Sequence, residues 1–67
     1  MIKLVPYNCY ESYGIRIVYI CEVKNGYKLF IDRCGNMRKY RVSWDIVTKL
    51  RPVDDVGFIQ FAKLLMI

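Results

Sequence analysis

Most residue types that support catalysis near neutral pH are missing from this chain. Its 67 residues include no histidine, the side chain most often used for general acid–base work and for activating a serine or cysteine nucleophile. The four glycines stand singly, so no glycine-rich loop is present to hold a phosphate. We therefore predict that the protein is not an enzyme and uses no cofactor.

The three cysteines do not form a metal or redox motif. Cys9, Cys21 and Cys34 are widely spaced, without the Cys-x-x-Cys pair of zinc sites and dithiol oxidoreductases. Arg33 and Arg38 flank Cys34 as in a reactive thiolate site, but no base is available, and we interpret Cys34 as a small filler residue. An odd cysteine count, with no signal-peptide-like apolar run at the start, favours reduced thiols and a cytoplasmic location.

The sharpest local feature is a basic run between Arg33 and Arg41, with four cations in nine residues. A tight turn at Gly35-Asn36 would place Arg33 opposite Arg38, and such a like-charge pair costs stability. An anion between the two side chains would relieve the repulsion, because arginine binds phosphate and carboxylate in bidentate fashion. The other interpretation is a solvated hairpin tip whose side chains splay apart.

The overall charge agrees with either interpretation. Eleven Lys and Arg against six Asp and Glu give a net charge of +5. This balance favours a polyanionic partner, either nucleic acid or an acidic protein surface, or it serves solubility alone.

The sequence predicts a β-meander over residues 15–43. Residues 15–23 are rich in β-branched and apolar types, and Asn25-Gly26 after them is a strong hairpin signal. Residues 27–33 then form the returning strand and residues 37–43 a third strand. With two-residue loops at both turns, Ile20, Ile31 and Tyr40 share the face that packs on the core.

The opposite face of this meander is our candidate nucleic-acid-binding site. Its basic side chains would contact phosphates and its two aromatic rings would stack on bases. The site residues are Arg33, Arg38, Lys39, Arg41, Lys28, Tyr19 and Phe30. Alternatively, Tyr19 and Phe30 form a second small core under the N-terminal segment, covered by Ile2 or Leu4.

The flanking segments complete a single α+β domain over residues 1–67. We predict a short strand over 2–7, a loop over 8–14, a short helix over 44–50 capped by Ser43, and a C-terminal helix over 54–66. Asp54 is the expected cap of this second helix, with Asp55 in its first turn. The predicted fold is a three- to four-stranded antiparallel meander packed by the C-terminal helix. A strand over 58–64 would instead give a five-stranded SH3-like barrel.

The last twelve residues suggest a different function. Their apolar surface is too wide for one buried helix face, and it is too short to span a membrane. We expect Phe58, Phe61 and Leu65 to bind a partner if the protein is a small regulator, of phage or plasmid origin, that inhibits or redirects a host protein. The same surface would also support a homodimer.

The plan of a basic three-stranded sheet followed by a helix, over residues 14–50, resembles two groups of proteins. One is the sheet-reading DNA-binding domains of plant AP2-type factors and some phage integrases. The other is the small basic SH3-like chromatin proteins of archaea, although this chain is poorer in lysine. The resemblance rests on strand order and charge, and it implies that a sheet face would contact nucleic acid.

Overall fold

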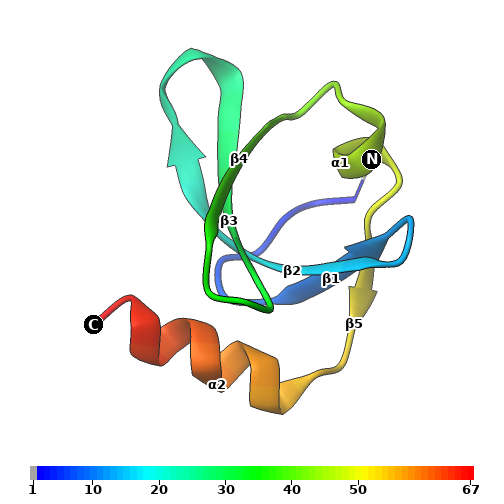
Figure 1. Cartoon of the computed structure of the whole chain (residues 1–67). Coiled ribbons are helices and arrows are strands. Elements are labelled where there is room, and N and C mark those ends of the chain that lie inside the picture. The colour runs from blue at the N-terminus through cyan, green and yellow to red at the C-terminus, as the bar shows by residue number, and fades with distance from the viewer. Residues whose placement is uncertain (1) are drawn as a thin grey trace.

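The computed structural model describes residues 2–67 and contains a five-stranded antiparallel sheet with a helix on either side (Figure 1). The strands are β1 (Cys9–Ser12), β2 (Ile15–Val23), β3 (Tyr27–Asp32), β4 (Met37–Arg41) and β5 (Arg51–Val53). The helices are a 3-10 turn η1 (Lys24–Gly26), α1 (Asp45–Thr48) and the C-terminal α2 (Val56–Leu65). The strand order is β4-β3-β2-β1-β5. The predicted α+β class, with an antiparallel sheet and a C-terminal helix, is confirmed, and the sheet has five strands.

Two of the five strands lie where the sequence did not place them. Residues 2–7 form no strand, because Pro6 and Tyr7 turn the chain, and pairing starts at Cys9. Residues 9–12, interpreted as loop, are β1, which joins β2 through a two-residue turn at Tyr13-Gly14 with positive φ at both positions. The fifth strand is Arg51–Val53 on the outer side of β1, where the missing donor of Pro52 is tolerated. Residues 58–64 are helical, so the expectation of a strand there was wrong.

The register of the meander also differs from the prediction. The first turn holds three residues, so Val23 pairs with Tyr27, and the second holds five, so Ile31 pairs with Met37. Asp32 fixes the longer turn because its carboxylate accepts from the amides of Cys34 and Asn36 at 2.9 Å. The observed pairing of β3 with β4 is shifted by an odd number of residues, and such a shift exchanges the two faces of a strand.

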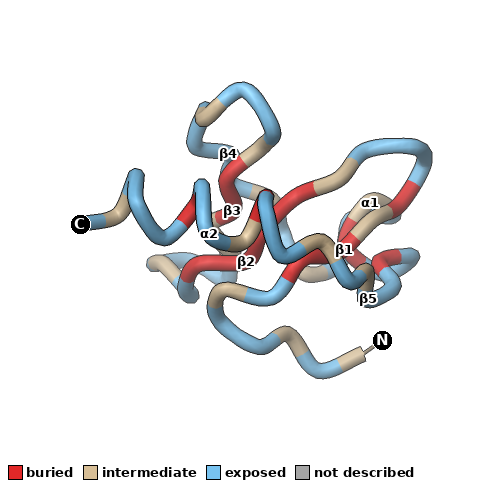
Figure 2. The backbone as a smooth tube through the Cα atoms, turned by 90° about the horizontal axis from the view of Figure 1, so that it is seen from below, coloured by how far each residue is buried: buried red, intermediate tan, exposed pale blue. Residues whose placement is uncertain are grey.

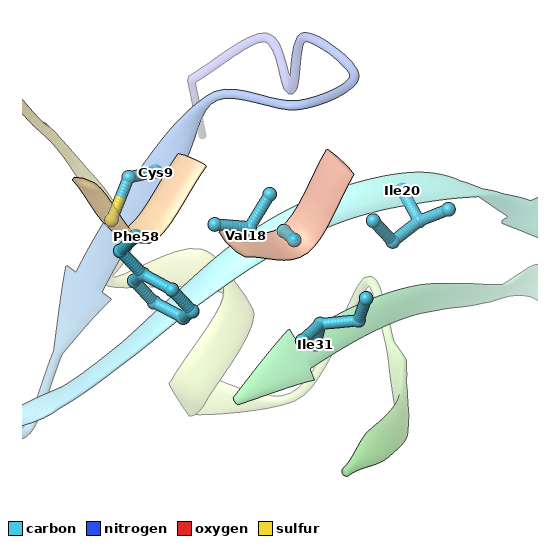
Figure 3. Packing of buried hydrophobic residues seen from close by; sticks show 6 residues of the cluster. Cys9, Val18, Ile20, Ile31 and Phe58 are labelled. Carbon is cyan, nitrogen blue, oxygen red and sulfur yellow. The ribbon is translucent and has the colours of Figure 1, made fainter. Parts of the chain in front are cut away.

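Both faces of the sheet carry a buried core. Figure 2 shows that the buried residues lie along the strands and in both α-helices. The helix-side core lies under α2 and consists of Cys9, Val18, Ile20, Ile31, Phe58 and Ala62. Figure 3 shows residues of three strands and the ring of Phe58 gathered in this core. The α1-side core, on the other face, consists of Tyr10, Ile17, Tyr19, Phe30, Val47 and Leu50.

The two helices begin at caps other than those expected. Trp44, not Ser43, is the N-cap of α1, and no side chain caps that helix. Asp55, not Asp54, is the N-cap of α2, and its carboxylate accepts from the amide of Phe58 at 3.2 Å. Neither helix, nor any other in residues 2–67, is long and apolar enough to cross a membrane.

Asp55 also fastens α2 to the sheet through ion pairs. It binds Arg16 of β2 at 2.9 Å and Arg33 of the β3–β4 turn at 3.0 Å. Arg16 continues to Glu11 at 2.9 Å, and Glu11 binds Arg51 at 3.2 Å. The hydrogen bond from Arg16, followed by that from the Phe58 amide, holds the pKa of Asp55 below its usual range. The start of α2 is thereby tied to β2 and to the β3–β4 turn.

We predict that replacing Asp55 by Asn weakens the acid sensitivity of the fold. The folded-state pKa of Asp55 is depressed, so its stabilising contribution is present above the ordinary pKa of about 3.8 and is lost as the pH falls through the lower folded value. Asn keeps the cap but loses the charge. The measurement is urea unfolding at about pH 6 and about pH 3. Asp54→Asn is the matched control, since Asp54 forms no ion pair with any described residue. An equal loss of stability in both variants at pH 6 would contradict the role of Asp55.

A second prediction concerns the contact between α2 and the β3–β4 turn. A Cβ at Gly35 would lie 3.2 Å from Leu65 Cδ1, whereas a Cβ at Gly26 meets nothing within 4 Å. Both glycines have positive φ, which costs roughly 1–2 kcal/mol for alanine. Gly35→Ala should therefore lower Tm more than Gly26→Ala does. Adding Leu65→Ala should remove the difference, and equal Tm values for the two single variants would show that Leu65 does not press on the turn.

Candidate nucleic-acid interface

Three of the predicted phosphate-binding cations are already paired within the fold. Arg33 binds Asp55, Arg38 binds Asp32 at 3.0 Å, and Lys28 binds Glu22. The guanidinium of Arg33 also lies over the Phe58 ring, 5.4 Å from its centroid. Arg33 and Arg38 therefore each have a carboxylate of their own, and no external anion is needed to relieve repulsion between them.

The two predicted stacking aromatics lie in the α1-side core. Phe30 is 0% exposed and Tyr19 is 6% exposed, and their rings are in contact with centroids 5.5 Å apart. They share one face of the sheet, as predicted, but that face is not open, because α1 and the N-terminal segment cover it. Ile2 and Leu4 pack against the same core, as the alternative interpretation had it. Neither ring offers a face to a base.

The remaining predicted cations, Lys39 and Arg41, are exposed on β4 and have no carboxylate partner in the described part of the chain. Five of the eleven Lys and Arg side chains form ion pairs, those of Arg16, Lys28, Arg33, Arg38 and Arg51. Across residues 2–67, the cations outside these pairs are Lys3, Lys24, Lys39, Arg41, Lys49 and Lys63. Lys24, Lys39 and Arg41 lie near one another at the end of the sheet that carries the β2–β3 turn.

Two of these cations, Lys24 and Lys39, line a hollow that also contains Tyr27, and Arg41 lies over the Tyr27 ring. The hollow has a volume of about 380 Å³ and is lined by Val23, Lys24, Asn25, Tyr27 and Lys39. It lies where the β2–β3 hairpin projects from the rest of the fold (Figure 1). Tyr27 pairs with Arg41 across β3 and β4, and the Arg41 guanidinium lies over the Tyr27 ring at 4.7 Å from its centroid. The β-sheet alternation puts Leu29 and Lys39 on the same face.

Trp44 adds an exposed ring to this surface, beside the half-buried ring of Tyr27. Its ring meets that of Tyr27 edge-on, with centroids 6.1 Å apart, and Trp44 is 43% exposed. Trp44 also contacts Tyr40 at 6.1 Å, and Tyr40 contacts the buried Phe30 at 5.6 Å. The pair of Tyr27 and Trp44 is therefore connected to the core through the rings of Tyr40 and Phe30. We call Lys24, Tyr27, Lys39, Arg41 and Trp44 the hairpin site.

Sequence reasoning found only part of the hairpin site. Lys39 and Arg41 were among the predicted residues, whereas Lys24, Tyr27 and Trp44 were not. A usable signal was present, because Lys24 and Tyr27 flank the Asn25-Gly26 turn, and turn-flanking residues of a projecting hairpin are exposed. Trp44 carried no such signal, because it lies at the start of the predicted short helix; in the structure it is the N-cap of α1, at the surface.

The second predicted surface, on α2, is partly open. Phe58 is buried in the helix-side core, whereas Phe61 and Leu65 are exposed and lie beside Gly35 of the β3–β4 turn. Leu64 is 69% exposed on the same helix. Phe61, Leu64 and Leu65, with Ile67 beyond the helix end, form an apolar strip along α2. A small hollow of about 190 Å³ lies between Arg33 and this strip.

The cysteines differ in accessibility. Cys9 is buried under α2, and burial is the main cause that raises the pKa of its thiol to about 11. Cys21 and Cys34 are exposed and free. Cys21 is in the row Cys21–Leu29–Lys39, next to the hollow, whereas Cys34 lies in the β3–β4 turn. No group of three potential metal ligands occurs among the residues that the structure describes.

The hairpin site thus combines unpaired cations with the half-buried ring of Tyr27 and the exposed ring of Trp44, while the α2 strip is apolar. Comparison of the chain with protein-family models, with curated proteins and with solved structures found no match.

Proposed function

We propose that the protein binds nucleic acid through the hairpin site. The observation that carries this proposal is a hollow lined by Lys24, Lys39 and Tyr27, with the Arg41 guanidinium over the Tyr27 ring. None of these three cations is paired with a described carboxylate. Lysine and arginine contact phosphates, and exposed aromatic rings stack on bases. The remaining side of the hollow, Val23 and Asn25, supplies an apolar surface and an amide.

The location of the site differs from the sequence-based proposal. Releasing Arg33, Arg38 or Lys28 to bind a phosphate requires breaking an internal ion pair, and Arg33 also supports the start of α2. Lys39 and Arg41 carry no such cost. The proposed phosphate contacts therefore shift from the β3–β4 turn to the β2–β3 turn and the far end of β4.

The fold that presents the site is, we infer, a small SH3-like barrel. β2 pairs with β1 along its first part and with β3 along its second, and a bulge at Ile20 bends it between the two. The sheet so bent curves around the α1-side core, and α1 leads from β4 to β5. The barrel expected from the sequence had its last strand at 58–64; here Arg51–Val53 is the last strand instead. By itself this fold carries no functional conclusion.

We predict that the triple variant Lys24→Ala, Lys39→Ala, Arg41→Ala loses most of its affinity for nucleic acid. Binding of a labelled strand of about 12 nucleotides would be followed by fluorescence anisotropy between about 50 mM and 200 mM salt. The slope of log K against log salt should decrease by about 2, since each lost contact to a single strand contributes about 0.7.

The matched control for this experiment is the triple variant Lys3→Ala, Lys49→Ala, Lys63→Ala, which removes the same charge from unpaired cations elsewhere. It should keep the slope of the unmodified protein. Equal weakening in the two triple variants would show that only net charge matters and would remove the hairpin site. Competition by polyglutamate as strong as that by the oligonucleotide would point to an acidic protein surface as the partner instead.

A second candidate function is regulation of another protein through the α2 strip, supported by the exposure of Phe61, Leu64 and Leu65. We predict that Leu64→Glu abolishes capture of such a partner without loss of fold, because Leu64 is 69% exposed. Gln60→Glu introduces the same charge at another exposed position of α2. A pull-down in which both variants retain the same bound protein would exclude the strip as its binding surface.

A further inference from the structure

We propose that the hairpin site is specific for single-stranded nucleic acid, with one unpaired base held in the hollow against Tyr27. This inference rests on the proposed function and names the substrate class of the same site.

The size and lining of the hollow favour a single planar group. Its volume of about 380 Å³ is at the lower end of the range for small-molecule sites, roughly 300–1,000 Å³. Val23 and Tyr27 make an apolar surface, while the Asn25 side chain at the rim has an amide donor and acceptor. A base has apolar faces and a polar edge, which match this arrangement.

Stacking of a base on the Tyr27 ring also requires that the base be unpaired. In a duplex, the faces of the bases are covered by their neighbours, so only a splayed or single-stranded base can stack on a protein ring. One part of the Tyr27 ring is covered by the Arg41 guanidinium at 4.7 Å, and its edge meets Trp44. Tyr27 also borders the hollow, where a base can reach it.

The site contains few cations, which suits contact with a short strand. Lys24, Lys39 and Arg41 lie around one end of the sheet, while the other unpaired cations of the described chain are on the N-terminal segment, after α1 and on α2. Duplex-binding proteins neutralise about 6–10 phosphates over a long surface. Three close cations match the few phosphates on either side of one bound base.

The rings are ordered before any ligand arrives. Trp44 contacts Tyr40, and Tyr40 contacts Phe30, which is completely buried. A strand that stacks on Tyr27 therefore loses its own freedom but does not have to order the protein's rings as well.

The closing experiment compares a strand of about 12 nucleotides with the duplex of the same sequence, at one salt concentration. Trp44, the single tryptophan, reports on the site by fluorescence, alongside anisotropy of the labelled nucleic acid. We expect the single strand to bind at least about 10-fold more tightly, and Tyr27→Ala to weaken it by about 5- to 160-fold, as expected for loss of one stacked base. Tyr27→Phe should retain most of the affinity, because it keeps the ring.

A second readout needs no substitution at Tyr27. The single strand should slow maleimide labelling of Cys21, which lies in the row beside the hollow, and leave labelling of Cys34 in the β3–β4 turn unchanged. Equal affinity for strand and duplex would overturn the single-strand assignment while leaving the proposed function in place. Protection of both thiols alike, or of neither, would show that the strand does not bind at the hairpin site and would overturn both proposals. Absence of binding to either form, even at low salt, would overturn the proposed function itself.

Discussion

The carboxylate of Asp55 is the interaction on which the arrangement of this fold depends. It stands where β5 ends and α2 begins, and it accepts from Arg16, Arg33 and the amide of Phe58. One side chain thus sets the start of the helix, its position over β2 and its contact with the β3–β4 turn. The helix-side core, including the buried Cys9, is covered only because α2 lies in this place. Without the carboxylate, Arg33 would lose its ion-pair partner and Arg16 one of its two partners.

The elements were easier to predict from the sequence than their pairing. The apolar character of residues 15–23, the Asn25-Gly26 turn and the apolar C-terminal segment indicated β2, β3, β4 and α2. The register could not be predicted, because it depends on one side chain, that of Asp32, which closes a five-residue turn. The bulge at Ile20 adds a further shift. A shift of an odd number of residues turns every side chain of a strand to the other face, and for this reason Lys39 and Arg41 lie on the side of Leu29 and not, as expected, on the side of Phe30.

The candidate site was partly predictable for a related reason. A cluster of cations along the sequence shows where positive side chains are, but not which of them have partners. Arg33 is paired by Asp55, 22 residues away, and that distance hides the pair from any local pattern. Lys39 and Arg41 remain unpaired because their neighbours across β3 are Leu29 and Tyr27, which are not carboxylates. The excess positive charge behind the net charge of +5 therefore lies mainly on cations that have no acidic side chain beside them in the folded chain.

One half of the helix-side face of the sheet is covered by α2, and the other half is exposed to solvent. α2 covers the half formed by β1, β2 and the end of β3, and apolar residues occupy it. The other half continues onto β4, where Lys39 and Arg41 take the positions that face the same side. β4 is an edge strand, and charged side chains on an edge hinder its pairing with other chains. The same charges leave that half of the face open to solvent. A small domain without enough residues to cover both halves thus protects its edge with the cations that, in our proposal, hold the phosphates of a bound strand.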